Sequence, residues 1–174
     1  MKDITPIQQR FILHWGEMGV RWGINRTMAQ IHALLYLSPE PLNAETICDR
    51  LGVARSNVSN SLRELQNWGI VKIVHLPGDR RDHFESMKEV WEMFRQVLDE
   101  RKRREIDPTI KVLTECAEAA GKEKDAATRE RITAMRDFFQ TMGTWYDQID
   151  ALPTPAVIKF VKLGGKVSKW VGMK

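Results

Sequence analysis

The side chains best suited to binding chemistry in this sequence lie on one predicted helix, residues 55–68. Val58, Leu62 and Leu65 recur at the spacing of a single apolar helix face. Elsewhere on the helix, the positions before Glu64 carry no carboxylate and no large apolar side chain. Their hydroxyl, amide and guanidinium groups are of the kinds that reach nucleic-acid bases and phosphates. The candidate binding residues on this helix are Arg55, Ser56, Asn57, Ser59, Asn60 and Arg63.

A shorter helix and a turn precede this polar helix and would hold it in place. Asn43 can cap the shorter helix, and Gly52 can adopt the left-handed conformation that a tight turn between helices needs. Ala54, directly before the polar helix, offers no side-chain acceptor for the free N–H groups of the first turn. Because an alanine cap costs about 1 kcal/mol relative to serine or asparagine, the first turn of the polar helix is expected to be weak.

The sequence after Gly69 changes from a helical period to alternation, which predicts a β-hairpin. Its strands would be residues 70–76 and 83–86, and the Pro-Gly-Asp sequence at 77–79 is typical of a turn. A further helix is predicted at residues 26–37, before the shorter helix. Three helices followed by a hairpin describe a winged helix-turn-helix. The expected fold class is mainly α, a winged helix-turn-helix with a small β-hairpin wing plus long dimerisation helices.

Two arginines, Arg80 and Arg81, would lie at the tip of this hairpin. Arginine at such a position can contact a DNA backbone or enter a narrow minor groove, whose negative potential favours it. Alternatively, the two arginines only pair with the neighbouring Asp79 and Asp82.

The chain is expected to contain four segments. Residues 1–25 would form an N-terminal helix that contributes to dimerisation, and residues 26–87 the winged helix-turn-helix domain. Residues 88–153 would form a helical dimerisation arm, and residues 154–174 a basic tail or short helix. Because one reading helix contacts only a few base pairs, two-fold pairing would double the contacts and match a pseudo-palindromic site.

The flanking helices carry apolar stripes at helical spacing. Which of these helices faces a partner chain is left open. The N-terminal stripe consists of Ile7, Phe11, Trp15 and Met18. In the arm, the residues expected to point inward are Ile132, Met135, Phe139, Met142, Tyr146 and Ile149.

Two charged segments have competing interpretations. The block at 100–105 is expected to be a solvated helix end, although it could also touch DNA phosphates or the other subunit. The tail from Thr154 holds five lysines and no acidic residue, and it is expected to be solvated. A basic amphipathic helix could instead lie on a membrane surface, but Gly164 and Gly165 interrupt this one.

Composition limits the possible functions. A length of 174 residues allows one domain, or a small domain plus an oligomerisation arm. The net charge of +4 suits a nucleic-acid partner without requiring one. Cys48 and Cys116 each stand alone, so we interpret them as small buried apolar residues. Neither a signal peptide nor a membrane-spanning run is found, which predicts a cytoplasmic protein without a membrane partner.

The sequence gives no support for enzyme chemistry. Its four histidines form no metal-ligand spacing and no nucleophile–base arrangement, and it contains no glycine-rich phosphate loop. We therefore predict no catalytic residue, no metal and no cofactor. His14 and His32 lie on apolar helix faces and are expected to be in the core.

The order of these motifs resembles that of GbsR/MarR-type winged helix-turn-helix transcriptional regulators. The resemblance implies a homodimeric DNA-binding protein, often a repressor, and some relatives regulate the uptake or synthesis of osmoprotectants. It also implies that the six polar residues of the reading helix contact DNA together with Arg80 and Arg81 of the wing. The segments that carry the resemblance are residues 22–27, 51–71, 78–86 and 91–108.

Aromatic residues raise the question of a small-molecule effector. The sequence holds six tryptophans, and several aromatic side chains fall near the expected junction of reading domain and arm. Such rings could bind a quaternary ammonium ligand through cation–π contacts, but they could equally be core packing. The candidate ligand residues are Trp15, Trp22, Trp91, Phe94, Trp145 and Tyr146.

Together these features predict a sequence-specific DNA-binding transcriptional regulator, a repressor that binds a pseudo-palindromic operator as a homodimer. Its expected partners are double-stranded DNA, a second copy of the chain and a small effector such as an osmoprotectant. The alternative is a winged-helix module that binds protein and not DNA.

Overall fold

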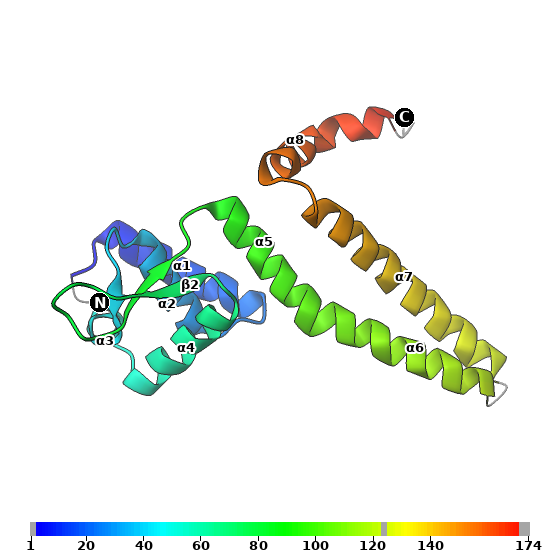
Figure 1. The fold of residues 1–174 in the computed structure, drawn as a ribbon, viewed down its shortest axis with the longest axis horizontal. Helices are drawn as coiled ribbons and strands as arrows, with labels where there is room; N and C mark the ends of the chain where they lie inside the picture. Colours follow the sequence, from blue (N-terminus) through cyan, green and yellow to red (C-terminus); the bar gives the residue numbers. More distant parts are fainter. Residues whose placement is uncertain (1–2, 123–124, 171–174) are drawn as a thin grey trace. The chain divides into compact units, whose positions relative to one another are not determined.

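The computed structural model describes residues 3–122 and 125–170, and for residues 164–170 only the backbone is described. The chain forms two compact units that divide between Gln96 and Val97. Both units are mainly helical, and the first also contains a small antiparallel sheet (Figure 1). The expected fold class, mainly α with a winged helix-turn-helix, is confirmed.

The first unit contains the helix-turn-helix and the hairpin. Helix α5 (Val90–Arg101) starts in this unit and ends in the second. In chain order, the elements that precede it are α1 (Pro6–Arg21), α2 (Arg26–Leu37), β1 (Leu42–Asn43), α3 (Ala44–Leu51), α4 (Arg55–Asn67), β2 (Val71–Val74) and β3 (His83–Ser86).

Helix α1 packs on α2 through a small-residue face. Gly19 is buried, and a Cβ atom at this position would lie 2.6 Å from the Cβ of Ala29, so only glycine permits this approach. The apolar stripe of α1 lies on a different face. Its first residue, Ile7, is 83% exposed, and Trp15 is 40% exposed. Helix α1 therefore presents apolar side chains to its surroundings.

The core of the first unit lies where α2, α3 and α4 meet. The side chains of Ile31 and Leu35 from α2, Ile47 from α3, and Val58 and Leu65 from α4 are each at most 1% exposed. Burying this apolar surface is the main favourable term in the fold. Because Val58 and Leu65 are buried in this core, the opposite side of α4 points outward.

The two histidines that were expected in the core, His14 and His32, differ in burial. His32 is buried, and its Nε2 has no hydrogen-bond partner among the described residues. Burial, and secondarily the positive charge of Lys88, lower the pKa of His32 to about 4, so the ring stays neutral near pH 7. The prediction for His14 was wrong. This residue is exposed because α1 turns its glycine face, and not this side, towards α2.

Lys88 joins the end of the hairpin to α2. Its ammonium Nζ donates hydrogen bonds to the carbonyl oxygens of Leu35 at 2.8 Å, Tyr36 at 3.0 Å and Ser38 at 2.7 Å. Carbonyls at a helix C-terminus lack helical N–H partners, and the helix dipole favours a cation there. Lys88 therefore anchors the segment that leads into α5.

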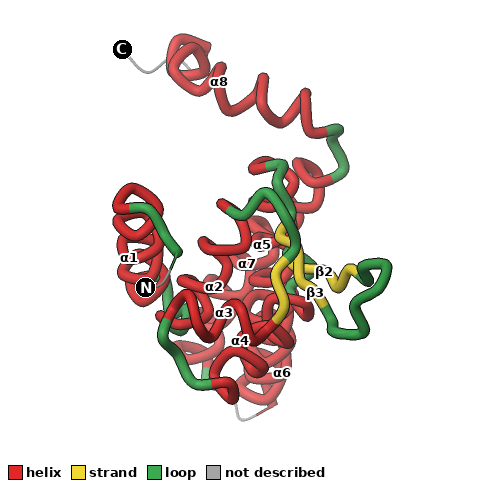
Figure 2. Tube along the Cα trace, turned by 90° about the vertical axis from the view of Figure 1, so that its left-hand side faces the viewer, coloured by secondary structure: helices red, strands yellow, loops and turns green. Residues whose placement is uncertain are grey.

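The wing belongs to a three-stranded sheet of order β1-β3-β2, one strand more than the expected hairpin. Strand β1 pairs antiparallel with β3, and Leu42 lies opposite Phe84. A strand of two residues is too short for alternation to show in sequence. The predicted hairpin is confirmed, with Val74 opposite His83 at the end next to the connecting loop. The loop beyond this pair projects from the strands (Figure 2).

The second unit consists of long helices. A continuous helical run passes from α5 through a π-helical segment, η1, into α6 (Figure 1). A proline inside an α-helix clashes with the carbonyl four residues earlier, and the wider turn directly before Pro108 is an adjustment that can relieve this. The remaining elements are η1 (Lys102–Ile106), α6 (Asp107–Lys122), α7 (Ala126–Asp150) and α8 (Thr154–Trp170).

The charged block around η1 is not simply a solvated helix end. The carboxylate of Glu100, only 6% exposed, pairs with both Arg103 and Arg104. Lys102 reaches Asp107 at 2.9 Å and Asp147 of α7 at 3.3 Å. The Lys102–Asp147 pair ties the π-helical segment to α7, which sequence periodicity could not reveal.

Helix α7 has two apolar faces. Gly143 is buried towards α6, where an added Cβ would meet Ile110 at 3.7 Å. Met135 and Met142 were expected to point inward, and this was wrong, because they are 51% and 45% exposed. They share their face with Phe138 and Trp145, and we name these four residues the α7 stripe. The other four residues that were expected to point inward are half-buried, so the prediction is right for part of this face. They are Ile132, Phe139, Tyr146 and Ile149.

Helix α8 includes the lysine-rich segment and continues through both glycines. Lys159 and Lys162 are exposed, whereas Lys166 and Lys169 lie outside the described side chains. In the part of the chain that the structure describes, no helix is long and apolar enough to cross a membrane.

Candidate nucleic-acid interface

Helix α4 is placed by a left-handed turn and by its buried face. Gly52 ends α3 with a φ of 68°, the conformation that glycine adopts without strain. Ala54 is the N-cap of α4 and makes no side-chain cap hydrogen bond, as the sequence predicted. All six polar candidates, Arg55, Ser56, Asn57, Ser59, Asn60 and Arg63, are exposed.

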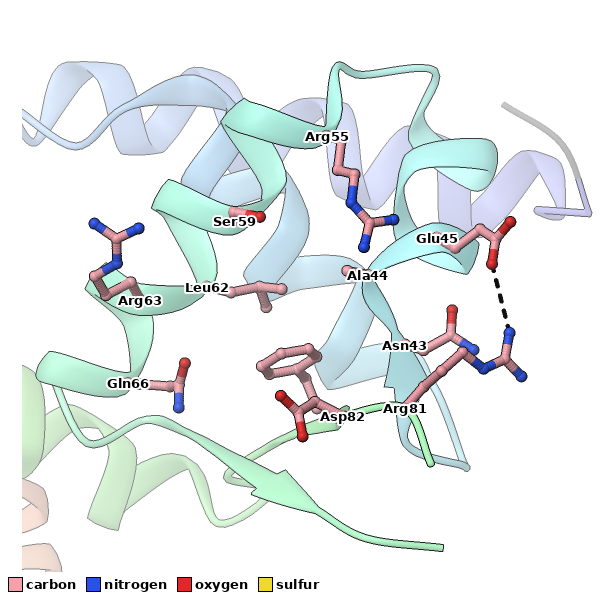
Figure 3. Close-up of a pocket in the computed structure, with 11 residues that line it drawn as sticks. Asn43, Ala44, Glu45, Arg55, Ser59, Leu62, Arg63, Gln66, Arg81 and Asp82 are labelled. Carbon is pink, nitrogen blue, oxygen red and sulfur yellow. Dashed lines mark hydrogen bonds and ion pairs between the residues drawn. The ribbon is translucent and has the colours of Figure 1, made fainter. Parts of the chain in front are cut away.

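A groove of about 390 Å³ runs between α4, the start of α3 and the base of the wing (Figure 3). From α4 it is lined by Arg55, Ser59, Arg63 and Gln66. Arg55 reaches from the first turn of α4 towards α3, whereas Arg63 points away from α3 (Figure 3). The residues that complete the lining are Asn43, Ala44, Glu45, Leu62, Arg81, Asp82 and Phe84.

The six candidates therefore divide into two groups. Three of them line the groove, and Ser56, Asn57 and Asn60 are exposed outside it. Gln66 of α4 also lines the groove, although it was not among the predicted binding residues. Its distance of seven residues from Ser59 places both on one helix face, a signal that could have found it.

The turn of the wing has a defined hydrogen-bonded geometry. The backbone N–H of Asp79 donates to the carbonyl of Leu76 at 3.1 Å, and Gly78 has a φ of 82°. Pro77 precedes it, which gives the residue order of a type II turn. The expected Pro-Gly-Asp turn is confirmed.

The two wing arginines are in different situations. Arg81 donates hydrogen bonds to the Asp79 carboxylate from two guanidinium nitrogens, Nε at 2.9 Å and Nη2 at 2.6 Å. Its third nitrogen, Nη1, lies 3.5 Å from the Glu45 carboxylate. Hydrogen bonds from Arg81 hold the pKa of the Asp79 carboxyl well below its usual range. Arg80 is exposed and makes no hydrogen bond or ion pair within residues 3–122 and 125–170. The pairing alternative thus describes Arg81 and not Arg80.

Glu45 adds a negative charge to this surface that was not predicted from the sequence. It lies in the first turn of α3, directly after the strand residue Asn43 and its neighbour Ala44. The side chain of Asn43 accepts the Thr46 N–H at 2.9 Å and so caps α3. This cap orients the first turn, and Glu45 with it, towards the groove.

The candidate ligand aromatics are spread over both units. In the first unit, Trp15 stacks on Phe11 with ring centroids 5.5 Å apart, and Trp91 meets Phe94 edge-on at 6.4 Å. Trp22 is 59% exposed. In the second unit, Trp145 is 49% exposed, and Tyr146 donates its hydroxyl to Asp99 at 2.7 Å. Trp91 and Phe94 are thus two candidates in ring contact with each other, and both are in the first unit.

Within the described residues, no group of three histidine, cysteine, aspartate or glutamate side chains is placed to hold a metal ion. Cys48 is partly buried and Cys116 is exposed, so the expectation that both are buried was wrong for Cys116.

The central segment of the chain is similar to a known protein family. Residues 22–82 match the model of the MarR family. A solved transcriptional regulator is similar over 90% of this chain and 99% of its own, with a TM-score of 0.64 and 19% identity, which shows a common fold. No match to a curated protein was found.

Two further solved structures align less closely. The transcriptional regulator Tm0710 from Thermotoga maritima matches with a TM-score of 0.39 and 18% identity, over 78% of this chain and 91% of that one. A mutant of MepR from S. aureus, bound to an oligodeoxyribonucleotide, matches with a TM-score of 0.40 and 14% identity, over 74% and 92%.

The missing cap of α4 gives a first prediction. Ala54→Ser should raise the free energy of unfolding by about 0.5–1 kcal/mol, because the hydroxyl can accept an N–H of the first turn. Urea denaturation measures this change. As a reciprocal control, Asn25→Ala removes the cap that accepts the Met28 N–H at 3.2 Å, and should lower the same quantity. A loss for the control with no gain for Ala54→Ser would contradict the prediction.

Proposed function

We propose that this protein is a sequence-specific, DNA-binding transcriptional regulator of the GbsR/MarR type that acts as a homodimeric repressor. The observation that carries the proposal is the exposed polar side of α4 beside a groove with arginines on both its walls. Arg55 and Arg63 come from α4 and Arg81 from the wing. The match of residues 22–82 to the MarR family model supports it.

The two groups of α4 residues suit two kinds of DNA contact. Arginines in a groove can neutralise phosphates, which positions a protein without reading sequence. Asparagine on the outward side can bond both N6 and N7 of adenine in the major groove. We assign sequence reading to Ser56, Asn57 and Asn60, and backbone contact to Arg55, Arg63 and the free Arg80.

The proposal predicts different effects of two substitutions. Arg80→Ala should weaken binding evenly across sequences and reduce the slope of log K against log salt by about 0.9 for each wing that contacts a phosphate. Asn60→Ala should instead change which sequences are preferred, at a cost of about 1–3 kcal/mol for the best site. Fluorescence anisotropy on labelled duplexes at several salt concentrations measures both.

Arg131→Ala, an exposed arginine of α7 outside the groove, serves as the matched control and should change neither quantity. If the protein shows no salt-sensitive binding to duplex DNA at low salt, the regulator proposal fails. The alternative, a winged helix that binds protein, would then be favoured.

We propose that the second copy covers the exposed apolar faces of α1 and α7. Ile7 and Trp22 on one side, and Phe138 with the rest of the α7 stripe on the other, are 45–83% exposed. Clusters of exposed apolar side chains, such as the α7 stripe, mark interaction sites. A homodimer would bury such a face and present two copies of α4 to successive turns of DNA.

Substitutions on these faces should separate the chains. Phe138→Glu and Ile7→Glu each place a charge into the proposed interface and should shift the mass measured by analytical ultracentrifugation from dimer towards monomer. The matched controls are Gln140→Glu and Gln9→Glu, which add the same charge at exposed positions off the stripes of the same helices. A wild-type chain that is monomeric at micromolar concentration would contradict the dimer.

We also propose a small effector that carries a quaternary ammonium group, such as an osmoprotectant, bound by one or more of the aromatic candidates. Trp15, Trp22 and Phe94 expose 40–59% of their surface in the first unit, and Trp145 exposes 49% in the second. Exposed ring faces can attract a quaternary ammonium group. Titration with betaine should change tryptophan fluorescence in the millimolar range, and an unchanged spectrum would count against the effector.

A further inference from the structure

We propose that Glu45 limits the affinity of the groove for DNA phosphates by keeping the wing arginine Arg81 engaged with carboxylates. This inference rests on the proposed DNA-binding function and assigns a negative regulator of affinity within the same site. Glu45 and Arg81 lie next to each other and form an ion pair at one side of the groove that Arg55 and Ser59 also line (Figure 3).

The charge of Arg81 is already balanced in the free protein. Asp79 accepts hydrogen bonds from two nitrogens of the Arg81 guanidinium. The carboxylate of Glu45 lies 3.5 Å from the third nitrogen, Nη1. A phosphate that enters the groove would therefore meet an arginine that has partners on two sides. It would also meet the carboxylates of Glu45 and Asp82, which line the same groove and repel it.

The two partners of Arg81 have different roles. Asp79 also accepts the backbone N–H of Arg81 at 3.0 Å and lies 3.5 Å from the buried His83, so it helps to shape the wing loop. Glu45 is 65% exposed and comes from α3, outside the loop. An exposed ion pair contributes little to folding because water screens it. Loss of the Glu45 charge should thus leave the wing intact and affect mainly what enters the groove.

The consequence is a testable gain of function. With Glu45 neutral, Arg81 can turn its free Nη1 towards a phosphate while Asp79 still holds the other side of the guanidinium. One more cation at the interface releases additional counterions, so affinity rises and its salt dependence becomes steeper. The natural chain would then bind DNA less tightly than its arginines allow.

The experiment compares full-length Glu45→Gln with the wild-type chain on one labelled duplex over a range of salt concentrations. We expect binding about threefold tighter or more at low salt, and a slope of log K against log salt steeper by about 0.9 for each Arg81 released. Asp49→Asn is the matched control. It removes the same charge from an exposed position of the same helix α3 that does not line the groove.

A second pair of variants isolates the role of Arg81. In an Arg81→Ala background, adding Glu45→Gln should give a clearly smaller gain than it gives in the wild-type chain, and no steeper salt slope, because no arginine is left to release. Thermal unfolding checks that each variant is folded, and glutamine keeps the length and shape of the glutamate side chain.

The outcomes distinguish a failure of the proposed role of Glu45 from a failure of the proposed DNA-binding function. If the wild-type chain binds duplex DNA in a salt-sensitive way but Glu45→Gln equals Asp49→Asn, or binds more weakly, the inference is overturned and the DNA-binding function stands. Weaker binding would mean that Glu45 positions Arg81 for the DNA. If the wild-type chain shows no salt-sensitive binding, both the inference and the proposed function fail.

Discussion

The burial of one face of α4 is the constraint on which the rest of the site depends. Val58, Leu62 and Leu65 pack into the core that α2 and α3 complete, and each is at most 2% exposed. Because a helix is rigid, fixing these three side chains also fixes the opposite side, where no apolar group competes with water or a ligand. The packing of the apolar face therefore determines that the polar residues of α4 are exposed.

Charge in the wing is the second determinant of the site. Arg80 and Arg81 are neighbours in sequence, but one is unengaged and the other is held by Asp79 and approached by Glu45. The loop geometry explains the difference, because the Asp79 carboxylate accepts both the backbone and the side chain of Arg81. The positive potential of the wing is therefore weaker than its two arginines suggest.

Local patterns in the sequence predicted much of this fold. The apolar spacing of α4, the left-handed Gly52, the uncapped Ala54 and the Pro-Gly-Asp turn all depend on residues close together in the chain, and the structure contains each of them. The predictions that failed depend on tertiary contacts. The exposure of His14 follows from how Gly19 approaches Ala29, which no periodicity shows.

The same reason explains what was missed in the site and the arm. Glu45 lies 36 residues from Arg81, and their proximity depends on the pairing of β1 with β3. In α7, two adjacent apolar faces gave one broad stripe in the sequence, so Met135 and Met142 were placed inward although they are exposed. Only packing against α6 distinguishes the two faces.

The central claim is that two copies of α4 read DNA. Selection of binding sequences from a random duplex pool tests it most directly, because the winners report both recognition and symmetry. The account predicts enrichment of inverted half-sites whose centres are about one helical turn, roughly 10 base pairs, apart or a multiple of it. A pool that stays random after repeated selection at low salt would contradict it.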